Sequence, residues 1–128
     1  YYYRRLYVDA VRGVETAAAH DRVDPDRIGV GGFSQGGALS LATSALVPER
    51  IHLCQAHMPY LCDIPHAIAI ADEPPYTELV EFLSQHQDDI TRVLDTLRYV
   101  DNAVLAPRIR ASRRPDPANE DTGTSTGR

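Results

Sequence analysis

The strongest constraint on this 128-residue chain is the segment Gly31-Gly32-Phe33-Ser34-Gln35-Gly36-Gly37, which contains the pattern Gly-x-Ser-x-Gly. Residues 27–31 before the serine read as a short buried strand, and residues 35–46 after it read as a helix rich in small residues. This is the setting of a nucleophile elbow, in which a strained turn lifts a serine hydroxyl above the sheet edge. Gly32 and Gly36 are expected in it because side chains at these positions would collide across the bend.

Helical and extended patterns alternate around this elbow. Residues 2–20 carry an apolar stripe at helical spacing, and residues 51–58 form a second strand candidate, which Pro59 ends. Between the first helix and the first strand, Val23-Asp24-Pro25-Asp26 predicts a turn, because Pro fixes one φ angle and Asp side chains bond nearby amides. No capping residue precedes the first helix, as in a chain cut from something longer. The first half is therefore predicted to be α/β, with a parallel sheet.

The second half has a different pattern. Helices are predicted over residues 64–71, 77–86 and 89–100, and they read as a helical insertion into the sheet domain. Residues 112–128 contain no large apolar or aromatic residue, so they are expected to be disordered. The predicted organisation is a partial domain over residues 1–111, with the elbow at 31–37 and the insertion at 63–100, followed by a polar tail at 112–128.

Composition excludes several classes of protein. The chain is 43% hydrophobic and 24% charged, typical of a soluble globular protein, and its net charge of −5 argues against binding to nucleic acid. It contains no apolar run long enough to span a bilayer and no signal segment at its start, so no membrane partner is expected. Two cysteines, Cys54 and Cys62, are too few for a disulfide framework. They fit a reducing compartment such as the cytoplasm and are expected to be buried.

Six separate segments carry a more specific signal: Tyr1-Tyr2-Tyr3-Arg4-Arg5, Asp9-Ala10-Val11-Arg12, Asp24-Pro25-Asp26-Arg27-Ile28, Gly32-Phe33-Ser34-Gln35-Gly36-Gly37, Pro59-Tyr60-Leu61-Cys62 and Leu97-Arg98-Tyr99-Val100-Asp101. Together they closely resemble the acetyl xylan esterase and cephalosporin-C deacetylase family of α/β-hydrolases, from Tyr1 to about Ala111. The resemblance implies a serine esterase, without a cofactor, that removes acetyl groups from small acetylated sugars and from cephalosporins, usually as an intracellular homo-hexamer. It also implies that Ser34 is the nucleophile and that the backbone amide of Gln35 supplies an oxyanion hydrogen bond.

Departures from the family pattern matter equally. His57 occupies a position that resembles one where the family usually carries Asp. The family places its catalytic Asp and His after a further strand, whereas this chain turns polar after Ala111, so the chain alone is predicted to be inactive. All thirteen basic residues are Arg, which indicates a G- and C-rich gene. The segment from Ser112 onward is therefore predicted to be a frame-shifted translation, and a genuine disordered tail is the alternative.

The sequence allows four other interpretations. A non-catalytic α/β-hydrolase remnant that only associates or aggregates through its open sheet edges is the alternative function. A triad of Ser34, Asp63 and His86 follows the chain order of this fold, but Asp63 and His86 read better as a loop cap and a helix-end histidine. The spacing of Cys54, His57, Cys62 and His66 resembles a zinc pattern, which we discount because residues 54 and 57 of a strand face opposite sides. The N-terminal tyrosines read as a half-buried helix face rather than a stacking platform.

Overall fold

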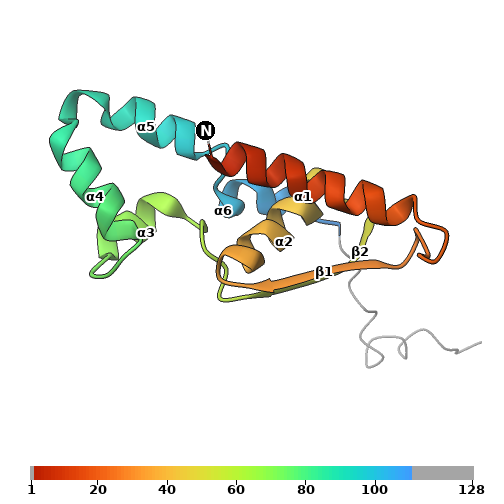
Figure 1. The fold of residues 1–128 in the computed structure, drawn as a ribbon. Helices are drawn as coiled ribbons and strands as arrows, with labels where there is room; N and C mark the ends of the chain where they lie inside the picture. The colour runs from red at the N-terminus through yellow and green to blue at the C-terminus, as the bar shows by residue number, and fades with distance from the viewer. Residues whose placement is uncertain (1, 111–128) are drawn as a thin grey trace, which may run out of the picture.

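A computed structural model describes residues 2–110 (Figure 1). Its helices and strands are α1 (Tyr2–Ala18), β1 (Ile28–Phe33), α2 (Gln35–Leu46), β2 (Ile51–His57), α3 (Ile64–Ile70), α4 (Tyr76–Gln85), α5 (Ile90–Leu97) and α6 (Asn102–Leu105). Short 3-10 turns, η1 (Gln87–Asp89) and η2 (Ala106–Arg108), precede α5 and follow α6. The alternation of helix and strand in the first half is confirmed, and so is the helical character of the segment that follows.

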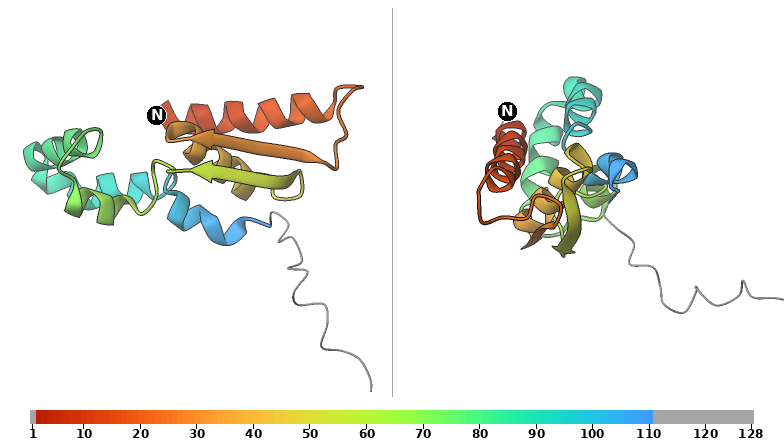
Figure 2. Two further views of the ribbon diagram at one scale, coloured as in Figure 1. Left: turned by 90° about the horizontal axis from the view of Figure 1, so that it is seen from below. Right: turned by 90° about the vertical axis from the view of Figure 1, so that its right-hand side faces the viewer.

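The two strands lie parallel, with Val30 opposite Cys54 and Phe33 opposite His57. Helix α2 connects them and packs on the sheet, and α1 lies beside α2 (Figures 1 and 2). Small residues allow this close approach, because Ala38, Ala42 and Ala45 of α2 are fully buried. The other face of the sheet is exposed: Phe33 retains 66% of its accessible surface and Leu53 retains 50%.

Several boundaries differ from the predicted ones for physical reasons. Strand β1 continues two residues beyond the predicted end at Gly31, because Gly32 and Phe33 still pair with β2. Strand β2 ends at His57, one residue early, because Met58 has a positive φ of 42°, which a strand cannot accommodate. Helix α1 stops at Ala18 rather than residue 20, and its end tightens through the bond from the His20 amide to the Ala17 carbonyl. The predicted Asp turn is confirmed by the Asp26 amide, which donates to Asp24 Oδ1 at 3.0 Å.

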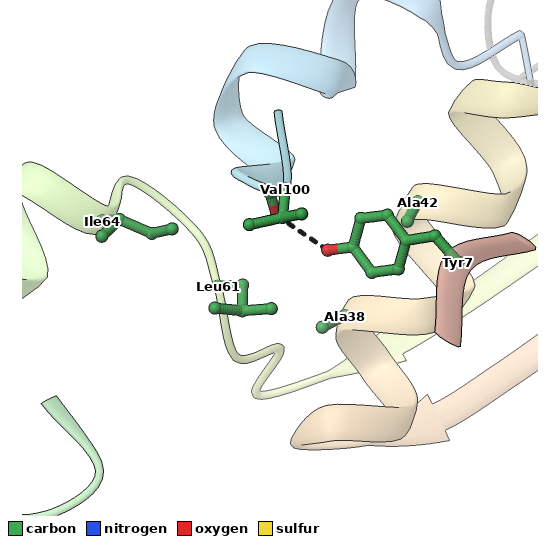
Figure 3. Close-up of a cluster of buried hydrophobic side chains, with 6 residues drawn as sticks. All are labelled: Tyr7, Ala38, Ala42, Leu61, Ile64 and Val100. Carbon is green, nitrogen blue, oxygen red and sulfur yellow. Dashed lines mark hydrogen bonds between the residues drawn. The ribbon is translucent and has the colours of Figure 1, made fainter. Parts of the chain in front are cut away.

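The main core joins the sheet unit to the helical segment. Tyr7, Ala38, Ala42, Leu61, Ile64 and Val100 form one buried cluster. Figure 3 shows the Tyr7 hydroxyl donating to the Val100 carbonyl, at 2.7 Å, in the middle of this cluster. A smaller cluster holds Val14 of α1 against Ile28 and Ile51, at the start of each strand. Tyr7 therefore lies on a buried face of α1, as its apolar stripe predicts.

The three helices α3 to α5 form an arm that extends from one end of the sheet (Figures 1 and 2). Helix α5 ends at Leu97, short of the predicted residue 100, because Val100 leaves the helix to enter the core. Helix α6 was not predicted. The predicted polar tail, and with it the frame-shift hypothesis, lies outside the described residues. Among residues 2–110, no helix is long and apolar enough to cross a membrane.

Candidate active site

Ser34 occupies the turn between β1 and α2 and is exposed. Its backbone has φ 52° and ψ −113°, a region that non-glycine residues rarely adopt and that costs roughly 1–3 kcal/mol. Three backbone hydrogen bonds hold the turn. The Ser34 amide donates to the His57 carbonyl at 3.0 Å, and the Ser34 carbonyl accepts from the amides of Ala38 at 3.0 Å and Tyr60 at 3.1 Å. The strained serine turn predicted from the sequence is confirmed.

Two glycines allow the chain to close around this turn. A Cβ at Gly32 would lie 2.4 Å from the carbonyl carbon of Gly36, so a side chain there must collide with backbone. The same expectation for Gly36 is wrong, since a Cβ at Gly36 would meet nothing within 4 Å. The second glycine that a side chain would disturb is instead Gly37, whose Cβ would lie 3.0 Å from the His57 carbonyl oxygen. Gly37 packs directly against the end of β2, whereas Gly36 only presents its backbone to Gly32.

Gln35 is the first residue of α2, directly after Ser34. Amides in the first turn of a helix have no partner within the helix and carry its positive dipole end. The Ser34 side chain makes no capping hydrogen bond to α2. The Ser34 hydroxyl is therefore not used to cap the helix, and the first amides of α2 follow it directly in the chain, the order that an acyl-transfer site uses.

The loop after β2 touches the elbow through Tyr60. The rings of Tyr60 and Tyr76 lie 5.0 Å apart, and the Tyr3 ring lies 6.1 Å from that of Tyr60. The Tyr76 hydroxyl accepts a hydrogen bond from the Leu61 amide at 3.1 Å. Burial raises the pKa of both Tyr60 and Tyr76, so these phenols stay protonated at neutral pH and cannot serve as the base for Ser34.

The discounted triad does not assemble around Ser34. His86 Nδ1 hydrogen-bonds the Phe82 carbonyl at 2.8 Å, and its ring stacks on Phe82 with centroids 4.2 Å apart, which confirms the helix-end interpretation. Asp63 precedes α3 but makes no side-chain capping bond, so its expected role as a cap is wrong. The carboxylate at this point is that of Asp101, which accepts from the amides of Asp63 and Ile64.

The four residues of the apparent zinc pattern are also spread out. Cys54 is partly buried, His57 at the end of the same strand is exposed, and His66 is exposed on α3. Cys62 is partly buried and directs its thiol to the Tyr60 carbonyl at 3.7 Å, and burial raises its pKa. Both cysteines are free, but the expectation that they are buried is wrong, because each is only partly buried. Within residues 2–110, no three His, Cys, Asp or Glu side chains gather where they could hold a metal ion.

A comparison with known proteins identifies the family. Residues 1–121 match the family described as acetyl xylan esterase (AXE1). The chain belongs to the acetyl xylan esterase family. The match extends past Ala111, where the resemblance was expected to stop, so the abrupt end on which the frame-shift hypothesis relies is not seen in this comparison.

Two relatives show how much of an esterase this chain represents. An acetyl xylan esterase from Paenibacillus sp. R4 superposes with a TM-score of 0.81 at 33% identity, over 87% of this chain and 36% of that one. The acetyl esterase Axe7A of Xylanibacter ruminicola is 41% identical over 64 residues, which are 50% of this chain and 14% of that protein. The fold is thus part of an α/β-hydrolase, and the chain spans well under half the length of either relative.

The sequence patterns did not predict the two buried polar residues that bind the loop between β2 and α3. Asp101 and Asn102 are buried, at 3% and 2% exposure, although such polar types are usually found at the surface. The available signal was an Asp placed directly before Asn102-Ala103-Val104-Leu105, since Asp is a preferred helix N-cap. The Asp101 side chain does cap α6, accepting from the Ala103 amide at 2.9 Å.

Proposed function

We propose that this chain carries the nucleophile of a serine esterase that removes acetyl groups from acetylated sugars. The observation that supports this most directly is the Ser34 turn, a non-glycine residue at positive φ, exposed between a strand and a helix. The family to which the chain belongs and the names of its two relatives supply the acetyl substrate class. Deacetylation of cephalosporins and assembly into a hexamer stay predictions.

In the proposed reaction the Ser34 hydroxyl attacks the acetyl carbonyl, and its proton passes to a base. The sugar hydroxyl leaves with a proton, and water then hydrolyses the acetyl-serine ester to acetate and free serine. The amide of Gln35, aided by the positive end of α2, would donate to the negative oxygen of each tetrahedral intermediate.

The base is not supplied by the groups that contact the elbow here. His57 reaches Ser34 through its backbone carbonyl, and His86 is held at the end of α4. A serine hydroxyl without a base is a weak nucleophile. The chain alone should therefore hydrolyse 4-nitrophenyl acetate no faster than its own Ser34→Ala variant, and a clear serine-dependent rate would contradict this part of the proposal.

The nucleophile itself is tested in a chimera. Residues 2–110 replace the segment of the Paenibacillus esterase that they match, so that the rest of that enzyme completes the site. In this chimera Ser34→Ala should lower kcat/KM for an acetyl ester by at least ~10³-fold, as in other triads. Ser84→Ala, which changes an exposed serine on α4, is the matched control and should have little effect. A Ser34→Ala chimera that keeps its activity would remove the assignment.

A further inference from the structure

We propose that Asp101 is a positioning residue for Ser34. Its buried carboxylate holds the loop between β2 and α3 in a strained conformation, and that loop in turn fixes the backbone of the elbow. The catalytic meaning of this role rests on the proposed function. The structural link itself does not, and it can be measured without any catalysis.

The Asp101 carboxylate is bound entirely by backbone amides in the described part of the chain. Oδ1 accepts from the amides of Asp63 and Ala103, both at 2.9 Å, and Oδ2 accepts from the Ile64 amide at 2.8 Å. The ion pairs found within residues 2–110 are Arg12–Asp9 and Arg92–Asp89, so no cation shares this charge there. Burying a carboxylate is costly unless it is hydrogen-bonded, and these three donors offset that cost.

Capping of α6 does not by itself require this arrangement. A serine would cap the Ala103 amide almost equally well with a single oxygen. The carboxylate uses its two oxygens to reach a second segment, 37 and 38 residues away in the chain. Asn102 also binds this loop, because its backbone amide donates to the Leu61 carbonyl at 2.8 Å.

The loop between β2 and α3 has a strained backbone that needs other contacts to hold it. Met58, Leu61 and Asp63 have φ angles of 42°, 57° and 51°, so three non-glycine residues adopt left-handed conformations within six positions. Each is unfavourable for a residue with a Cβ, and such strain persists only where surrounding contacts over-determine it. The bonds from residues 101 and 102 to this loop supply those contacts.

The loop is joined to the nucleophile at its other end. The Tyr60 amide donates to the Ser34 carbonyl at 3.1 Å, and Ser34 donates to His57, the last residue before the loop. A loop released at Asp63 and Ile64 therefore loosens one of the two hydrogen bonds on the Ser34 carbonyl. The expected consequence is a less well-defined φ at Ser34.

The experiment measures amide hydrogen exchange by NMR in the full 128-residue chain. Asp101→Ser keeps an oxygen for the Ala103 amide but is too short to reach Asp63 and Ile64. Protection of the Asp63, Ile64 and Tyr60 amides should fall at least ~10-fold, while amides in the middle of α2 change less than ~2-fold. The intraresidue HN–Hα NOE of Ser34, which is strong where φ is positive and weak where φ is negative, should weaken.

Two further variants sharpen the test. Asp101→Asn keeps one acceptor oxygen and replaces the other with a donor, so its exchange rates should lie between those of the wild type and Asp101→Ser. Asp95→Ser changes an exposed carboxylate on α5 and should alter none of these amides.

Two results would overturn the proposal. One is normal protection of Tyr60 and an unchanged Ser34 HN–Hα NOE despite faster exchange at Asp63 and Ile64. The other is a uniform loss of protection across α1 and α2 in both Asp101 variants, which would make Asp101 a general stability residue. Failure of the Ser34→Ala test in the chimera would be a separate result, because the exchange measurement involves no turnover.

Discussion

Replacing Gly32 with alanine should destabilise the chain because the new methyl group has no room. Its Cβ would lie 2.4 Å from the carbonyl carbon of Gly36 and 2.6 Å from the carbonyl oxygen. Ordinary contact begins at 3.4 Å, so the backbone of the turn must open by 3.4 − 2.4 = 1.0 Å. Overpacking of this kind costs roughly 1–3 kcal/mol, and the upper end applies because both colliding partners are backbone. Alanine returns about 0.4–1 kcal/mol by restricting the unfolded chain, which leaves a net loss of about 2 kcal/mol.

Urea unfolding followed by far-UV circular dichroism measures this loss, since most of the described structure is helical. With a slope of about 1–2 kcal/mol/M, the midpoint should fall by about 1–2 M, or helical signal should be lost without urea. Gly36→Ala is the matched control in the same turn, because its Cβ meets nothing within 4 Å. It should leave stability unchanged or raise it by up to about 1 kcal/mol. A Gly32→Ala midpoint equal to that of Gly36→Ala would refute the steric argument for the elbow.

Two further predictions concern Tyr7. Tyr7→Phe removes the 2.7 Å bond to the Val100 carbonyl and leaves that buried acceptor without its donor, which should cost about 1–3 kcal/mol in urea unfolding, whereas Tyr2→Phe at a 63% exposed position should cost nothing measurable. Burial raises the pKa of Tyr7 above the ordinary value of 10.0, so the folded state keeps a proton that the unfolded state loses. Its contribution to stability is therefore complete below pH 10 and falls above it, by at most ~1.4 kcal/mol per pH unit for one group. Unfolding curves between pH 9 and 11 that show no smaller slope in Tyr7→Phe than in the wild type would contradict this assignment.

The sequence is most informative where one local rule decides the structure. The extent of α2, the Asp24 turn and the strained Ser34 turn each follow from residues within a few positions of one another, and all three were predicted. The role of Gly36 was misjudged because a glycine pattern shows that a turn is tight but not which Cβ meets which atom.

The support behind the elbow depends on contacts that no local pattern encodes. Val100 has the spacing of the α5 stripe, yet it leaves the helix because Tyr7, 93 residues earlier, binds its carbonyl. Asp101 gains its role from two amides on a loop nearly forty residues earlier in the chain. Periodicity counts neighbours along one element, so it cannot detect a carboxylate that caps one helix and holds a distant loop.

The hydrogen bond between Tyr7 and Val100 also brings together two residues that lie near opposite ends of the described chain. Closing a loop of 93 residues rather than the 23 that separate Ile28 from Ile51 adds about 1.2 kcal/mol of entropy cost, two doublings at roughly 0.6 each. A contact with that cost is favourable only when the residues around it are already ordered. Fraying of α1 would therefore release Val100, then its neighbours Asp101 and Asn102, and finally the loop that steadies Ser34. We therefore expect the first helix and the Ser34 turn to unfold as one cooperative unit, and a two-step urea curve for Tyr7→Phe would contradict that coupling.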